Sequence, residues 1–215
     1  MGFTSVCIKA LLGLLTCSGP VLANATLRVS PERSQFFKYH PISLTCEEQN
    51  NSTAWQVKRR TTSGSNGTCN LDWGALTGLS CIIKVPYPWD NGLYWCESDF
   101  GELTPSINIT VADGPVIMES PLLPVTEGDN VTLRCRTKAA LSNLSADFYK
   151  DGFFIRTEST GKMTIHIASK SDEGLYKCNI SELGESPESW LAVRAYSDEE
   201  RRKRKLEDVI VESDI

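Results

Sequence analysis

The chain has 215 residues, of which 40% are hydrophobic and 23% charged, and a formal net charge of −5. This length allows one or two domains, and the composition is that of an ordinary soluble protein. Because nucleic-acid binding depends on clustered Lys and Arg, the acidic balance excludes a nucleic-acid partner from our expectations.

Residues 1–23 have the pattern of a secretory signal peptide. Lys9 precedes a short apolar run from Ala10 to Cys17, and the segment closes on Val21-Leu22-Ala23. A membrane-spanning helix needs about 20 apolar residues, and this run is roughly half as long. We therefore expect cleavage after Ala23. Charged residues interrupt every later apolar run, so we expect no transmembrane segment in this chain.

Cysteine usage indicates an oxidising compartment. Removal of the signal peptide leaves six cysteines: Cys46, Cys69, Cys81, Cys96, Cys135 and Cys178. An even number in a secreted chain predicts disulfides. The six form no C-x-x-C pair, so we expect no zinc or other metal site. Nothing in the sequence indicates a cofactor.

Asn-x-Ser/Thr sequons agree with a secreted or extracellular location. Asn24 would become the new N-terminus and is a poor acceptor, and Asn50 and Asn51 overlap, so that the pair is expected to accept one glycan. The predicted glycosylation sites are Asn50, Asn51, Asn66, Asn108, Asn130, Asn143 and Asn179.

A long repeat divides the mature chain. PISLTCEE around Cys46 matches NVTLRCRT around Cys135, and WDNGLYWCES around Cys96 matches SDEGLYKCNI around Cys178. The period of about 80 to 90 residues lets each copy close its own core. We predict two domains, 24–112 and 113–195, joined at Asp113-Gly114-Pro115.

Within each copy the apolar residues alternate, which predicts half-buried strands. Ile42, Leu44 and Cys46 share one face, as do Val131, Leu133 and Cys135 in the second copy. The same reasoning places Met163, Ile165 and Ile167 on an inner face. Short strands bounded by Gly, Pro, Asn or Ser are typical of an antiparallel sandwich.

The strongest motif is D-x-G-x-Y-x-C, which occurs twice. It reads Asp90, Gly92, Tyr94, Cys96 in the first copy and Asp172, Gly174, Tyr176, Cys178 in the second. In an immunoglobulin sandwich this tyrosine hydrogen-bonds back to the backbone at a strand corner, and we expect the glycine to permit the turn conformation. We therefore predict an all-β protein with two tandem immunoglobulin-like (C2-type) antiparallel β-sandwich domains.

This fold predicts two disulfides, Cys46–Cys96 and Cys135–Cys178, each worth about 3–4 kcal/mol. We expect Trp55 to pack on the first bridge, with Phe148 in the corresponding place in the second domain. Cys69 and Cys81 are additional: we expect them to close the loop 70–80, and a disulfide to a partner chain is the alternative.

Several segments resemble the Fc receptor-like branch of the immunoglobulin superfamily, most closely the leukocyte immune-type and Fc receptor-like proteins of bony fish. They are YWCESDFGE after Leu93, SPLLPVTEGDNVTLRC from Ser120, ADFYKDG from Ala146, SKSDEGLYKC from Ser169 and SPESWLAVR from Ser186. The resemblance implies two sharply bent C2-type domains that bind immunoglobulin Fc or a class I histocompatibility-like protein. Related receptors for IgG grip an Fc proline between two tryptophans, and here Pro115 and Leu123 stand at those places.

Three residues are candidates for ligand contact. Trp95 is expected to point outward because Tyr94 and Cys96 point inward, and exposed tryptophans are frequent at binding hot spots; alternatively it covers a neighbouring Lys or Arg stem. Pro115 and Leu123 complete the set at the domain junction. Trp73, Trp89 and Trp190 are expected in the core or at the junction. His40 and His166 form no triad pattern, so we predict no enzyme activity.

The segment 196–215 is charged, has no strand pattern and is expected to be a disordered tail. Its basic run 201–205 also fits a furin-type cleavage site. We therefore expect a secreted immune receptor that binds a protein ligand. An adhesion or structural immunoglobulin-superfamily module without Fc binding is the alternative.

Overall fold

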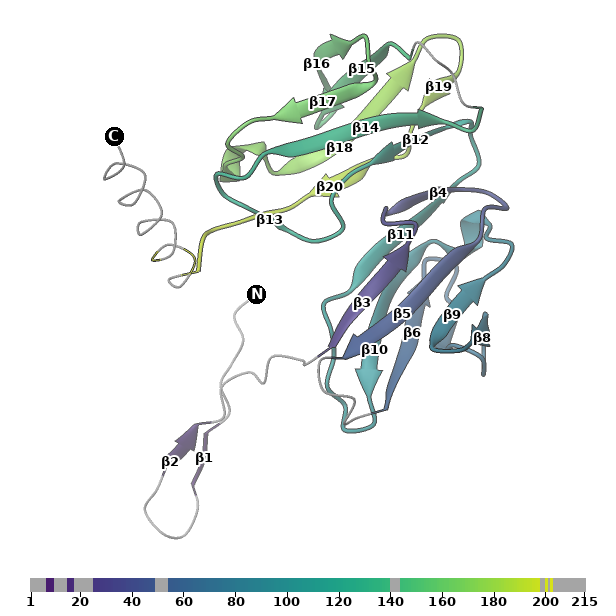
Figure 1. The fold of residues 1–215 in the computed structure, drawn as a ribbon, viewed down its shortest axis with the longest axis vertical. Coiled ribbons are helices and arrows are strands. Elements are labelled where there is room, and N and C mark those ends of the chain that lie inside the picture. Colours follow the sequence, from purple (N-terminus) through teal and green to yellow (C-terminus); the bar gives the residue numbers. More distant parts are fainter. Residues whose placement is uncertain are drawn as a thin grey trace, which may run out of the picture.

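The computed structural model describes residues 7–9, 15–17, 25–48, 54–139 and 144–197, together with Glu200 and Arg202. Two short strands, β1 (Cys7–Lys9) and β2 (Leu15–Cys17), pair only with each other. The other strands form two β-sandwiches (Figure 1). Most of the predicted signal peptide and of the tail lies outside the described residues.

The first sandwich packs a four-stranded sheet against a five-stranded one. The four-stranded sheet has the order β3 (Ala25–Ser30), β5 (Ile42–Glu48), β9 (Ser80–Ile83) and β8 (Ala75–Thr77). The five-stranded sheet has the order β4 (Gln35–Phe37), β11 (Ile107–Ala112), β10 (Gly92–Ser98), β6 (Trp55–Thr61) and β7 (Asn66–Thr68). Among the described strands of this sandwich, β4 and β11 form a parallel pair and the other paired strands are antiparallel. A 3-10 turn, η1 (Pro88–Asp90), leads into β10.

The second sandwich repeats this plan. One layer is formed by β12 (Val116–Glu119), β14 (Val131–Thr137) and β17 (Lys162–Ile165). The other contains β16 (Phe153–Glu158), β15 (Ala146–Lys150), β18 (Gly174–Ile180) and β19 (Gly184–Glu185), with β20 (Ser189–Leu191) also on β18. A short parallel pair joins β13 (Val125–Thr126) to β21 (Val193–Arg194), and η2 (Lys170–Asp172) precedes β18.

Each sandwich has a separate apolar core, as the alternating strands predict. The two cores extend from Leu27 to Val111 and from Val116 to Leu191. A disulfide crosses each core, Cys46–Cys96 in the first and Cys135–Cys178 in the second. Since the chain passes from one core to the other after β11, we propose the domain boundary at residues 112 and 113.

One predicted inward residue is not inward. Met163 is buried and Ile165 is half-buried, but Ile167 is exposed, because β17 ends at Ile165. Ile167 has a φ of 54°, a left-handed conformation that breaks the alternation. Ala168 takes the inner position after it, at 1% exposure.

The aromatic filling of the first core also differs from the prediction. Val57 stands opposite Cys96, as Phe148 stands opposite Cys178, so Trp55 is not the counterpart of Phe148. Trp55 is only partly buried against the core. The buried tryptophan is Trp73, which packs edge-on against Tyr94 at 5.5 Å between ring centroids.

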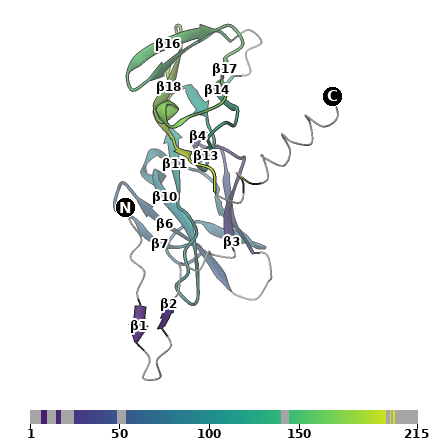
Figure 2. The same ribbon diagram turned by 90° about the vertical axis from the view of Figure 1, so that its left-hand side faces the viewer.

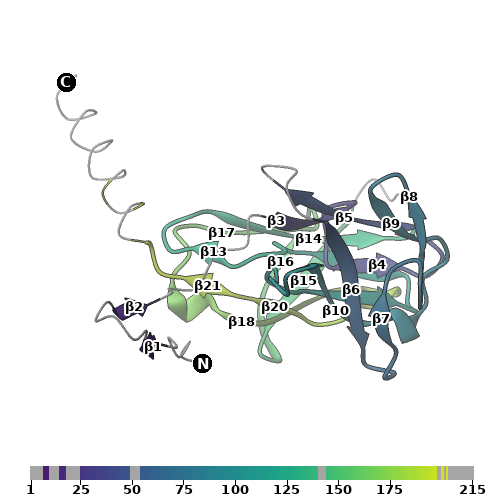
Figure 3. The same cartoon turned by 90° about the horizontal axis from the view of Figure 1, so that it is seen from below.

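The two sandwiches meet through a small contact between β4, β11 and β12. Phe37, Ala112 and Ile117 form an apolar cluster there. The buried side chain of Gln35 accepts a hydrogen bond from Met118 N at 2.8 Å and donates one to Pro187 O at 2.9 Å. These contacts fix the bend: the strands of the second sandwich run across the end of the first (Figure 1), and from below the second sandwich extends to one side (Figure 3).

Candidate ligand-binding surface

Both tyrosine corners are formed. Tyr94 Oη donates to Asp90 O at 2.6 Å, and Tyr176 Oη donates to Asp172 O at 2.8 Å. The aspartate side chains accept from the backbone three residues earlier, from Tyr87 N at 2.9 Å and Ser169 N at 2.8 Å. Each motif therefore ties a 3-10 turn to the following strand.

Burial raises the pKa of both corner tyrosines, Tyr94 and Tyr176, to about 12. A tyrosine with a raised folded-state pKa stabilises the fold below its unfolded pKa of about 10, and this contribution is lost as pH rises toward 12. We expect unfolding to become easier between these pH values, measured by chemical denaturation at each pH. Tyr94→Phe should reduce that alkaline loss; an unchanged pH profile would contradict the assignment.

The two motif glycines allow a close approach of neighbouring atoms. A Cβ on Gly92 would lie 2.3 Å from Arg60 O, and one on Gly174 would lie 2.8 Å from Asp151 Oδ2. Gly92 also has a positive φ of 158°, a conformation that side chains with a Cβ rarely adopt, as predicted. Gly174 does not have a positive φ, so the predicted reason is wrong for Gly174.

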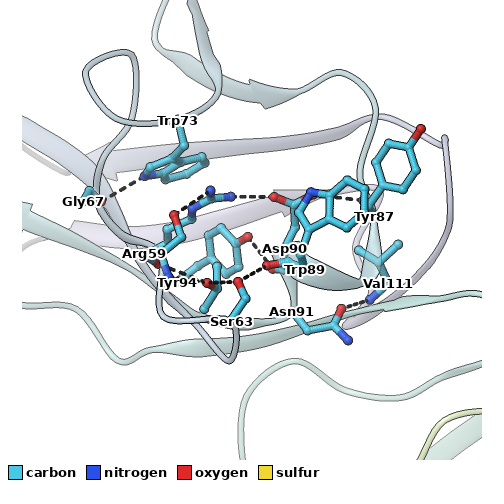
Figure 4. Close-up of polar contacts among 12 residues, drawn as sticks. Arg59, Ser63, Gly67, Trp73, Tyr87, Trp89, Asp90, Asn91, Tyr94 and Val111 are labelled. Atoms are coloured by element: carbon cyan, nitrogen blue, oxygen red, sulfur yellow. Dashed lines mark hydrogen bonds and ion pairs between the residues drawn. The ribbon is translucent and has the colours of Figure 1, made fainter.

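A buried ion pair supports the corner of the first domain (Figure 4). Arg59 Nη1 lies 2.7 Å from Asp90 Oδ1, and both side chains are buried. The Arg59 guanidinium lies 4.6 Å from the ring centroid of Trp73, whose Nε1 donates to Gly67 O at 2.9 Å. The corner thus connects β6, η1 and the loop that Cys69 and Cys81 close.

Further hydrogen bonds hold the turn 87–91 from outside. Ser63 Oγ donates to Trp89 O at 2.9 Å, and Thr62 N donates to Asn91 O at 2.8 Å. Asn91 Oδ1 accepts from Val111 N at 2.6 Å. Because its backbone is fixed on several sides, this turn presents the side chains of Tyr87 and Trp89 in a defined position (Figure 4).

Tyr39, Tyr87 and Trp89 form an aromatic cluster at the surface, in which Tyr87 is half-buried between two exposed rings; we call this cluster the aromatic platform. Tyr87 and Trp89 stack at 4.1 Å with their rings 12° apart, and Tyr39 packs edge-on against Tyr87 at 5.1 Å. Trp89 is 57% exposed. Tyr39 has a φ of 72°, and its N–H donates to Pro86 O at 3.1 Å, which holds the two segments together.

Two lysines border the platform. Lys38 Nζ lies 5.2 Å from the Tyr39 ring centroid and 5.1 Å from that of Tyr87, within cation–π range. Lys138 of the second sandwich lies 5.7 Å from the Tyr39 ring. The hydrogen bond between Lys38 and Asp113, at 3.1 Å, raises the pKa of Lys38. The platform therefore reaches across the domain junction and has a cationic border.

Of the three predicted contact residues, only Pro115 lies beside the platform. Pro115 is exposed, and its carbonyl accepts from Lys138 N at 3.0 Å. Trp95 is half-buried opposite Lys58, and its Nε1 donates to Glu97 Oε2 at 3.4 Å. Leu123 is exposed and lines a separate groove of about 320 Å³ with β3.

Two other tryptophans were expected in the core or at the domain junction. Trp89 and Trp190 are both more than half exposed and are not in the core, but Trp89 belongs to the platform at the junction. The exposure of Trp89 could have been predicted from the sequence. Asp90 faces inward in the tyrosine corner, so its neighbour in a 3-10 turn faces outward. Tyr39 could not be associated with Trp89 from the sequence, since it is 50 residues away.

The disulfide and sequon residues are placed as follows. Cys69 pairs with Cys81, which is buried opposite Leu44 just as Met163 lies opposite Leu133. Asn66, Asn108 and Asn130 are exposed and Asn179 is half-buried. Asn50, Asn51 and Asn143 lie outside the described residues. Occupancy of these sites by glycans stays a prediction.

The part of the chain that the structure describes contains no group of three or more His, Cys, Asp or Glu residues that could hold a metal ion. His166 is exposed on the loop after β17, and His40 packs against Phe37 with 5.6 Å between ring centroids. Among the same residues, no helix has the length and apolarity needed to cross a bilayer.

Comparison with known proteins agrees with the fold. The immunoglobulin domain family matches residues 114–189. Fc receptor-like protein 5 of Mus musculus is 30% identical over 161 residues, which cover 72% of this chain and 25% of the relative. Low affinity immunoglobulin gamma Fc region receptor II of Mus musculus is 24% identical over 170 residues, covering 74% and 46%. The chain thus spans between a quarter and just under half of these relatives.

Among solved structures, the second Ig-C2 domain of human Fc-receptor like A is 26% identical, with a TM-score of 0.32, and the match covers 37% of this chain and 95% of that one. The doubled tyrosine corner and paired sheets define a tandem immunoglobulin-domain protein. The relatives that it matches are Fc receptor-like proteins, so the resemblance to the Fc receptor-like branch of the immunoglobulin superfamily is confirmed.

Proposed function

We propose that this chain is the extracellular part of an immune receptor that binds immunoglobulin Fc or a class I histocompatibility-like protein. The observation that carries the proposal is the aromatic platform, which lies exposed at the domain junction on a turn that the buried Asp90 fixes. Tyr and Trp are enriched at hot spots because they offer a large contact area at low conformational cost. A rigid turn lowers that cost further.

Two other observations support an extracellular binding role. Three disulfides are formed, which is typical of an oxidising compartment. One relative is by name an immunoglobulin gamma Fc region receptor, which supports Fc as the first ligand to test. Pro115 and Leu123 stand where related receptors have the tryptophan pair that grips Fc. An Fc ligand would therefore have to contact another surface of this chain, and the platform is the surface that we propose.

We expect Trp89→Ala to weaken ligand binding by about 30-fold or more, which corresponds to a hot-spot loss of about 2 kcal/mol. The measurement is surface plasmon resonance of the purified chain against immunoglobulin and class I proteins. Trp190→Ala is the matched control, because Trp190 has a similar exposure in the second sandwich, away from the platform. It should bind as the parent chain does.

Trp95→Ala distinguishes a binding site at Trp95, which the sequence favours, from one at the aromatic platform, which the structure favours. If Trp95→Ala abolished binding while Trp89→Ala had no effect, the site would lie on the outer face of β10 and not at the platform. If neither class of protein bound the parent chain, the receptor role would be wrong. An adhesion or structural module would then be the better description.

A further inference from the structure

The strand β16 leaves one side of the second sandwich open. It is the last strand of its sheet and pairs with β15 alone among the described residues. Phe153, Phe154 and Ile155 follow one another on this edge and are 78%, 58% and 40% exposed. Figure 2 shows β16 at the outer limit of the molecule. An exposed apolar edge strand presents unpaired backbone groups together with apolar side chains, and both favour addition of another strand.

The protection of this edge is partial: the pairing of β16 with β15 shifts register at Ile155, because Arg156 lies opposite Phe148 and Phe154 lies opposite Tyr149. Proline is absent from 153–158, and the sequence places no sequon in this segment. The strand carries two charges, and these neutralise each other: Arg156 Nε lies 2.8 Å from Glu158 Oε1. The Phe154 ring packs edge-on against Tyr149 with 5.8 Å between centroids, so the exposed ring has a defined position.

We propose that β16 pairs antiparallel with β16 of a second copy of this chain, around a two-fold axis. An isologous contact requires a surface that fits itself, and an apolar strand without net charge meets this condition. The two charges of β16 already neutralise each other, so a pairing of two copies brings no unpaired like charges together. A strongly charged partner strand would find no opposite charge on this neutral edge, so charge attraction would not favour its binding.

The contact area sets the strength of this pairing. A fully buried Phe contributes about 150–250 Å², so the exposed parts of the three side chains amount to on the order of 300 Å² in each copy. Stable dimers bury about 1,200 Å² or more in total. We therefore expect a weak, concentration-dependent dimer, which would gain effect where several copies are held close together. This inference is independent of the ligand proposed for the platform.

The test is sedimentation velocity of the secreted chain over a wide concentration range. We expect a reversible shift from monomer toward dimer, and we expect Phe154→Lys to abolish it, because edge lysines prevent strand pairing. Leu71→Lys is the control, since Leu71 is an exposed apolar residue as well, at 78% against 58% for Phe154, but lies in the first sandwich. This variant should dimerise as the parent does.

Hydrogen exchange identifies the surface directly. The amides of residues 153–157 should exchange more slowly at high than at low protein concentration, and Phe154→Lys should remove the difference. A chain that stays monomeric at all concentrations would refute the proposal. So would a dimer that survives Phe154→Lys or leaves exchange in β16 unchanged.

Discussion

Replacing Asp90 by Ala should lower the free energy of unfolding of the first domain by about 3–5 kcal/mol, since it leaves the Arg59 guanidinium buried without its counter-ion. The Tyr87 N–H would also lose its acceptor. Because both partners are buried, water cannot replace the lost carboxylate. The measurement is urea unfolding followed by tryptophan fluorescence, which reports mainly on the first domain, where four of the five tryptophans lie.

Asp172→Ala provides the matched control for this substitution. Asp172 occupies the same place in the second tyrosine corner and accepts the corresponding hydrogen bond from Ser169 N. It makes no buried ion pair in the described structure, so its loss should cost about 1 kcal/mol, the value of a turn cap. If the two substitutions cost the same in their own domains, the Arg59–Asp90 pair would not have the role we assign to it.

Removing the second core disulfide, by Cys135→Ala together with Cys178→Ala, should cost about 4 kcal/mol and strongly reduce secretion. The bridge closes a loop with a sequence separation of 43, and the loss of chain entropy in the unfolded state grows with that length. Both sulfurs lie in the core, so the cavity adds to the cost. Secretion is measured by comparing medium and cell lysate, and stability by thermal unfolding.

Replacing Cys69 and Cys81 together by Ala provides the comparison for this disulfide. The Cys69–Cys81 bridge spans a sequence separation of only 12, for which the same reasoning gives a loss of stability of about 3 kcal/mol. The loop also keeps its Trp73 anchor, which is buried against Tyr94. We therefore expect the Cys69 and Cys81 variant to be secreted better. A larger loss there than at Cys135 and Cys178 would show that loop closure does not dominate.

The sequence by itself determined the class of fold and its internal repeat. The strand pattern, the paired D-x-G-x-Y-x-C motifs and the even number of cysteines are local features. Each has few structural solutions, because alternation requires a half-buried strand and the tyrosine must find a backbone acceptor close by. The outward direction of Trp95 followed from the same alternation, although the structure places its side chain only half in solvent.

Only the tertiary structure decided what the exposed residues form. The aromatic platform brings Tyr39 to Tyr87 and Trp89 from a distant segment, and Lys138 to it from the other domain. Trp73 and not Trp55 fills the first core, since Val57 stands opposite Cys96. The open edge at β16 depends on which strand ends the sheet. Periodicity identifies which face of a strand is buried, but neighbours across a sheet and between domains are set by chain topology, which no local pattern encodes.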